Sequence, residues 1–258
     1  MTKAPAARKR RGKKKKKSAL WARHPDDWYV EPTWVSASIF AVEKFEGRVW
    51  DPACGLGRIV VAAQNAGLNA IGTDLVARAG DAYEGGIDFL KVSAKDGEPN
   101  IVSNIPFGIA QAFVEKCLQL ADRKVALLLP AGWLLGEKRS AWLETTPLRR
   151  VWFITPRPSM PPGPVVEAGI KPGNGSDDFA WFVWLKGYDG APEIRWIRRD
   201  EVTRDIELPS NEIPVFKGSE EMRRDAIKLQ GQLETPNGLP LFKPRKPVVR
   251  SATKGASA

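Results

Sequence analysis

Residues 48–66 read RVWDPACGLGRIVVAAQNA, and this stretch decides the predicted fold. Arg48 to Asp51 has the composition of a short strand, and Gly55 and Gly57 follow it in a turn. Arg58 to Ala66 then has the apolar spacing of a helix, which a glycine ends. A strand that passes through a glycine turn into a helix is typical of α/β proteins.

Outward from this stretch, predicted strands and helices alternate. The further strands are expected at residues 69–74, 86–90, 100–104, 124–130, 149–155 and 180–186, and the further helices at 37–45, 108–120 and 137–144. The strand KVALLLP at 124–130 is of the kind found at the centre of a parallel sheet. The alternation predicts a Rossmann-like, doubly wound α/β sheet of about seven strands. The last two strands lack a clear helix between them, so we expect them to form an antiparallel hairpin at the sheet edge.

The two ends of the chain differ from its middle. Residues 1–17 hold ten of the 40 Lys and Arg residues and no acid, so the rest of the chain has 30 basic and 30 acidic residues. Such a segment cannot bury apolar surface and is expected to be disordered. We predict a basic tail over 1–20, a folded domain over 21–197 and a partly disordered extension over 198–258, with an amphipathic helix near 220–233.

Within the predicted domain, the Pro- and Gly-rich stretch 156–178 is a long loop, and such loops are often functional.

Composition makes several classes of protein unlikely candidates. No apolar run reaches the ~18 residues that suggest a membrane span, and no apolar core follows the basic N-terminus, so neither a span nor a secretory signal is expected. Cys54 and Cys117 are the only cysteines, which is too few for a disulfide scaffold or a zinc site. We therefore expect a protein of the reducing cytoplasm.

Three carboxylates follow three successive predicted strands: Asp51, Asp74 and Asp88. The carboxyl ends of parallel strands meet at one crevice, where glycines allow close approach to a ligand and a helix N-terminus offers free N–H groups. Gly-x-Gly alone is equally compatible with a plain tight turn. The prediction of a ligand site therefore depends on the three carboxylates taken together. A dinucleotide fingerprint needs a third glycine where this chain has Val60, which disfavours a nicotinamide oxidoreductase.

The strand expected at 100–104 leads into SNIPFG at 103–108. With this motif, the chain over roughly residues 29–186 resembles the S-adenosylmethionine-dependent amino methyltransferases, in particular DNA adenine-N6 methyltransferases of the phage and prophage kind. Asn104 to Phe107 resembles their catalytic Asn-Pro-Pro-Phe tetrapeptide. The resemblance implies a class I methyltransferase fold, S-adenosylmethionine as cofactor and DNA as partner, with RNA as an open alternative.

The same resemblance implies roles for single residues. Asp51 to Gly57 is similar to the cofactor motif, Asp74 to the ribose-binding acid and Asp88 to the residue that meets the cofactor's adenine amine. Glu31-Pro32-Thr33 is similar to the segment that helps to hold the methionine end. The implied cofactor site comprises Thr33, Asp51, Pro52, Ala53, Cys54, Gly55, Gly57, Asp74, Leu75, Asp88 and Phe89.

The implied catalytic residues are Asn104, Ile105, Pro106 and Phe107. The exocyclic nitrogen of adenine is a poor nucleophile, because its lone pair is delocalised into the ring. Acceptors that face its two N–H groups, the Asn104 side-chain oxygen and the Ile105 carbonyl, return that lone pair to nitrogen as it attacks the sulfonium methyl. The Phe107 ring stacks on the base. No metal or covalent nucleophile is required, and a duplex base has to be flipped out.

The chain departs from the family pattern at Ile105, where proline is usual. The carbonyl is retained but proline's fixed φ is lost, so we expect weaker preorganisation. An RNA or cytosine-N4 methyltransferase with the same pocket, and an inactive nucleic-acid-binding protein of this fold, are the alternative interpretations. The sequence predicts neither a recognition site nor an oligomeric state.

Other residues have mostly structural interpretations. His24, the only histidine, is expected in an exposed linker, and Cys54 is expected to be a small packing residue. Trp152, Trp181 and Trp184 fall in strands and are expected in the core or on the sheet surface. The residues expected to line the cleft are Trp28, Tyr29 and Trp34. The Lys-rich tail either grips phosphates or only keeps the protein in solution.

Overall fold

The computed structural model of the chain describes residues 24–93, 98–169 and 175–203. The tails and the amphipathic helix expected near 220–233 lie outside these ranges. The helices are α1 (Thr33–Val42), α2 (Arg58–Asn65), α3 (Ala110–Leu120), α4 (Glu137–Leu143), α5 (Gly163–Glu167) and α6 (Arg199–Thr203). The strands are β1 (Val49–Asp51), β2 (Ala70–Gly72), β3 (Glu98–Asn104), β4 (Ala121–Pro130), β5 (Leu148–Thr155), β6 (Phe179–Leu185) and β7 (Glu193–Arg198).

The seven strands form one sheet in the order β2-β1-β3-β4-β6-β5-β7. β6 runs antiparallel to both β4 and β5, and the remaining pairs are parallel. The doubly wound α/β class and the antiparallel β5–β6 pair are confirmed. The strand order reverses between β1 and β3, which is where sheets of this kind open a crevice at their carboxyl ends.

Two details of the predicted sheet differ. Residues 86–90 form no strand, because Gly86 has a φ of +79° and the segment folds back on the loop after β2. There Ile87 N–H donates to the Asp74 carbonyl, and Phe89–Lys91 then turn into a 3-10 helix. The unexpected strand β7 pairs with β5 and forms this edge of the sheet, so the β5–β6 hairpin does not lie at the edge as predicted.

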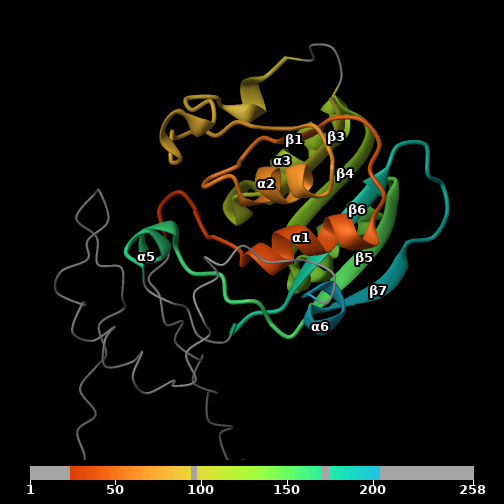
Figure 1. Cartoon of the computed structure of the whole chain (residues 1–258). Helices are drawn as coiled ribbons and strands as arrows, with labels where there is room; N and C mark the ends of the chain where they lie inside the picture. Colours follow the sequence, from red (N-terminus) through yellow and green to blue (C-terminus); the bar gives the residue numbers. More distant parts are fainter. Residues whose placement is uncertain (1–23, 94–97, 170–174, 204–258) are drawn as a thin grey trace, which may run out of the picture.

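Helices cover both faces of the sheet (Figure 1). The buried residues of α1 and α2, such as Ile39 and Val60, pack on one face, and those of α3, such as Phe113, pack on the other. β4 is buried on both sides, as its apolar sequence predicted. Trp181 and Trp184 are fully buried, which confirms their predicted core role. No helix in the described ranges is long and apolar enough to cross a membrane.

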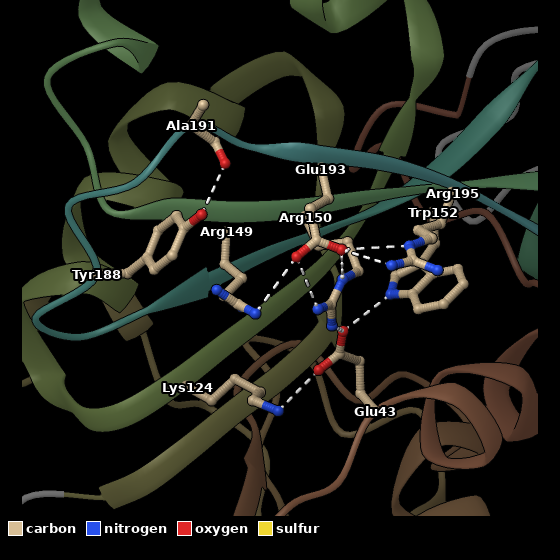
Figure 2. Close-up of polar contacts among 9 residues, drawn as sticks. All are labelled: Glu43, Lys124, Arg149, Arg150, Trp152, Tyr188, Ala191, Glu193 and Arg195. Atoms are coloured by element: carbon tan, nitrogen blue, oxygen red, sulfur yellow. Dashed lines mark hydrogen bonds and ion pairs between the residues drawn. The ribbon is translucent and has the colours of Figure 1, made fainter.

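An ionic network holds the end of α1 to the sheet (Figure 2). The Glu43 carboxylate accepts hydrogen bonds from Lys124 Nζ at 2.8 Å, from Trp152 Nε1 at 2.9 Å and from Arg150 Nη1. Arg150 also contacts Glu193 on β7. Burial raises the pKa of Glu43, but these hydrogen bonds and the charge of Lys124 outweigh it, so the pKa ends below its ordinary value.

Replacing Glu43 with Ala should lower the free energy of unfolding by about 3–5 kcal/mol, because it leaves Arg150 and Lys124 without their buried partner. Glu46→Ala is the matched control. Its side chain is 55% exposed where that of Glu43 is 4% exposed, so its ion pair with Arg123 should contribute less than about 1 kcal/mol. Urea denaturation at pH 7 measures the free energy of unfolding of both variants. Equal losses would contradict the role of Glu43 as the buried partner of Arg150 and Lys124.

The contribution of Glu43 to the free energy of unfolding should also depend on pH. A carboxylate whose pKa is lowered in the folded state stabilises the fold above its unfolded pKa, and that contribution is lost as pH falls through the folded pKa. The difference between the wild type and Glu43→Ala should therefore shrink below the ordinary value of 4.5. Repeating the denaturation down the acid range checks this, and a difference that grows would contradict it.

Candidate functional site

One pocket opens at the carboxyl ends of β1, β2 and β3, at the point where the strand order reverses. It brings together most of the predicted site. The predicted residues that line it are Asp51, Pro52, Ala53, Cys54, Gly55, Asp74, Leu75, Asp88, Phe89, Asn104 and Pro106. The predicted cofactor motif and the predicted catalytic motif therefore share a single cavity.

Four predicted residues lie behind the pocket wall. Thr33 begins α1, and Gly57 precedes α2 with a φ of +77° under the ring of Tyr83. The side chain of Ile105 is buried in the core beneath the sheet edge. Phe107 lies half-buried and packs against the rings of Tyr29 and Phe179. These residues shape the pocket through their backbone or through a neighbour.

The glycine turn after β1 is tied to the end of β2 by Asp74. Gly55 has a φ of +53°, and its N–H donates to Asp74 Oδ2 at 2.8 Å. Asp74 Oδ1 accepts from the Val76 N–H at 2.9 Å. The acid predicted to bind ribose thus also holds two backbone segments of the pocket in place.

Asp51 links β1 to β3 from inside the fold. Its Oδ1 accepts hydrogen bonds from Ser103 Oγ at 2.7 Å and from the Ala53 N–H at 3.2 Å. Burial raises the pKa of Asp51 well above its ordinary value, and the nearby negative charge of Glu31 adds to this effect. Asp51 therefore positions the turn that carries the glycines.

The Asn104 side chain is held by the segment that precedes α1. Its Nδ2 donates to the Tyr29 carbonyl at 2.8 Å and to Glu31 Oε2 at 2.7 Å. Glu31 is buried, and its Oε1 accepts from Ser36 Oγ at 2.8 Å. Burial raises the pKa of Glu31, while the hydrogen bonds from Ser36 and Asn104 oppose that rise.

Residues 26–31 form a whole wall of the pocket, which we call the N-terminal wall. Asp27 Oδ2 accepts from the Gly108 N–H at 2.6 Å, next to the predicted catalytic motif. On the opposite side, Arg78 pairs with Asp26 at 3.0 Å and lies over the Trp28 ring. The wall therefore joins the predicted cofactor half of the pocket to the predicted substrate half. Sequence reasoning missed Asp26, Asp27 and Arg78; the only available signal was the acidic pair beside the aromatic residues.

The Pro- and Gly-rich loop packs behind this wall. Val30 N–H donates to the Pro161 carbonyl at 2.9 Å, and Gly163 N–H donates to the Trp28 carbonyl at 3.0 Å. Figure 1 shows the segment before α1 beside α5. The described part of the loop thus supports the pocket from outside.

Two single-residue predictions were wrong. His24 is buried rather than exposed: its Nδ1 accepts from the Asp26 N–H at 3.2 Å and its ring packs edge-on against Trp28. Burial lowers its pKa. Trp34, on α1, is buried in the core rather than in the cleft. Trp28 and Tyr29 do line the pocket, and Cys54 is a buried packing residue, as predicted.

The pocket is rich in carboxylates. Its lining acids are Asp26, Asp27, Glu31, Asp51, Asp74 and Asp88, and its lining bases are Arg58 and Arg78. Apolar side chains that are exposed at its rim are Leu75, Val76, Leu90 and Ile109. Within the described ranges, no cluster of three or more His, Cys, Asp or Glu could hold a metal ion. The site is suited to a partly apolar ligand that carries positive charge.

No protein-family model matches the sequence, and no curated protein matches it. Among solved structures, a type I restriction-modification system methyltransferase subunit from Streptococcus thermophilus is similar at 14% identity and a TM-score of 0.46, over 76% of this chain and 51% of that one. A magnesium protoporphyrin IX methyltransferase from Synechocystis PCC 6803 with bound SAM is similar at 15% identity and a TM-score of 0.40, over 59% and 76%. The chain thus spans about half of the restriction-modification subunit. Similarity at this level does not transfer an activity, so function is argued from the site.

Gly163→Ala should disturb the N-terminal wall. A Cβ there would lie 2.2 Å from the Trp28 ring, which is itself held against Arg78 and Gly55. We expect a loss of about 1–3 kcal/mol in unfolding free energy, as for overpacking in a core. Gly132→Ala is the control, because a Cβ there meets nothing within 4 Å, and it should change stability by less than about 0.5 kcal/mol. Urea denaturation of both variants measures this, and equal values would show that Trp28 is not confined.

Proposed function

We propose that this chain transfers a methyl group from S-adenosylmethionine to the N6 amino group of adenine in DNA. The observation that carries the proposal is the shared cavity: Asp74 and the glycine turn line the same pocket as Asn104 and Pro106. Methyl transfer needs the donor and the acceptor in direct contact, and a single pocket for both motifs meets that requirement.

The chemistry of the pocket supports this cofactor. S-adenosylmethionine carries a net positive charge through its sulfonium and ammonium groups, and six carboxylates against two guanidinium groups line the cavity. The apolar rim of Leu75, Val76 and Leu90 offers a surface for a flat base. The demethylated product loses the sulfonium charge, so an acidic pocket favours the donor over the product.

The catalytic motif supports an amine as the acceptor. With its Nδ2 bonded to Tyr29 and Glu31, Asn104 keeps its side-chain oxygen for a ligand, and no described residue donates a hydrogen bond to that oxygen. A carbonyl oxygen beside a sulfonium donor draws electron density onto an attacking N–H group. Tyr29 lines the pocket beside Asn104, and its ring, which packs against Phe107 behind it, offers a face on which an extruded base stacks.

Asn104→Ala tests the proposed reaction. It should lower the methylation rate by at least about 10²-fold, as the loss of one preorganised polar group does, while the Kd for S-adenosylmethionine changes by less than about threefold. Mass spectrometry of nucleosides from treated DNA measures the product, and calorimetry measures cofactor binding. Gln111→Ala, which removes an exposed amide on α3, is the control. N4-methylcytosine, methylated RNA or an absence of product from the wild type would each overturn the proposal.

The basic N-terminal segment is proposed to bind the DNA backbone. Residues 1–17 contain the whole excess of positive charge, and the described chain enters the fold at the N-terminal wall of the pocket. Replacing Lys13 to Lys17 with Gln should weaken DNA binding and reduce the slope of log K against log salt by about 0.9 for each lost phosphate contact. Titrations at several salt concentrations measure this. An unchanged slope would assign the segment to solubility alone.

A further inference from the structure

We infer that Glu31 is a positioning residue that orients the Asn104 amide, so that its oxygen faces the pocket as a hydrogen-bond acceptor. The catalytic meaning of this role rests on the proposed function, but the orientation itself can be tested without any reaction. Glu31 lies 73 positions from Asn104 in the sequence and reaches it only through the N-terminal wall.

The orientation follows from the two partners of the amide nitrogen. Asn104 Nδ2 lies 2.8 Å from the Tyr29 carbonyl oxygen and 2.7 Å from Glu31 Oε2. A backbone carbonyl only accepts hydrogen bonds, and so does a carboxylate in its charged form. The flipped amide would therefore place its oxygen against two acceptors and would lose both bonds. The nitrogen uses its two protons in the wall, and the oxygen is left for a ligand.

Glu31 can impose this orientation because it is itself held from two sides. Its second oxygen, Oε1, accepts from Ser36 Oγ at 2.8 Å, and Arg58 Nη1 donates to its backbone carbonyl at 2.5 Å. The side chain is buried between the start of α1 and the end of β3. A buried carboxylate with both oxygens bonded has little freedom to move, and hydrogen bonds to an ionised acceptor are about twice as strong as neutral ones.

The orientation decides which substrates the pocket accepts. With the oxygen toward the pocket, Asn104 matches a ligand that presents an N–H group, such as an exocyclic amine. With the nitrogen toward the pocket, it would match a carbonyl and would repel an amine. Glu31 therefore favours an amino-bearing base and sets the lone pair of that amine for attack.

The first test reads the amide directly. In ¹⁵N-labelled protein, the two Asn104 side-chain protons are assigned by their loss in Asn104→Asp. Glu31→Leu should move the proton bonded to Glu31 upfield and speed its exchange with water by at least about tenfold. Glu31→Gln should move the same proton upfield by less, because a neutral oxygen replaces a charged one. If Glu31→Leu does not fold, the test is decided by Glu31→Gln alone. Ser36→Ala, which removes one of the contacts that hold Glu31 but leaves its carboxylate in place, should move the proton by less than Glu31→Leu does.

The second test uses the rate of methylation. At saturating S-adenosylmethionine, Glu31→Leu should lower kcat by about 10²-fold, as a small misplacement of a reacting group does. Glu31→Gln should retain kcat within about fivefold, since its oxygen still accepts from Asn104. Rescue by Gln is a result that a role in stability through charge alone would not produce.

The outcomes separate the two proposals. Asn104 protons that do not respond to either Glu31 variant would overturn the positioning role, whatever the activity. Protons that move while kcat in Glu31→Leu stays at the wild-type value would also overturn it. If the protons respond to the Glu31 variants but the wild-type protein produces no methylated adenine, the proposed function is refuted. The orientation of the amide then still stands.

Discussion

The site depends on how residues 26–31 are held across the carboxyl ends of the strands. Hydrogen bonds from Asn104 and Gly108 attach this segment to the end of β3, and the ion pair with Arg78 attaches it to the loop after β2. Without that bridge, the glycine turn and the predicted catalytic motif would lie exposed at the carboxyl ends of the strands. The wall also shields one side of the pocket from water, which strengthens the electrostatic interactions there.

Buried acids are the main electrostatic feature of this pocket. Burial raises the pKa of Asp51 and of Glu31, so their charged forms are expensive unless they are hydrogen-bonded. The protein satisfies them with hydroxyl and amide donors, Ser103 for Asp51 and Ser36 with Asn104 for Glu31. The charge of Arg58 further favours the ionised form of Glu31. The ionic network of Glu43 differs, because Lys124 and Arg150 neutralise it within the protein.

Local patterns predicted most of the elements, because their signals lie within a few residues. The apolar run of β4, the helical spacing of α2 and the glycine turn each appear in the structure near their predicted bounds. The strand predicted at 86–90 does not form, because a left-handed glycine and hydrogen bonds to the Asp74 backbone compete with strand pairing. β7 was missed because an edge strand with exposed Ile194 and Trp196 lacks a clear alternation.

The sequence by itself determined the α/β class, the order of its motifs and the residue types that the proposed chemistry needs, since periodicity and turn residues act locally. Only the tertiary structure decided which of those residues share a cavity. It buried His24 and Trp34, placed Ile105 and Phe107 behind the wall and brought Glu31 to Asn104 across 73 positions. Contacts over such separations depend on how strands and helices pack, and no short stretch of sequence encodes that packing.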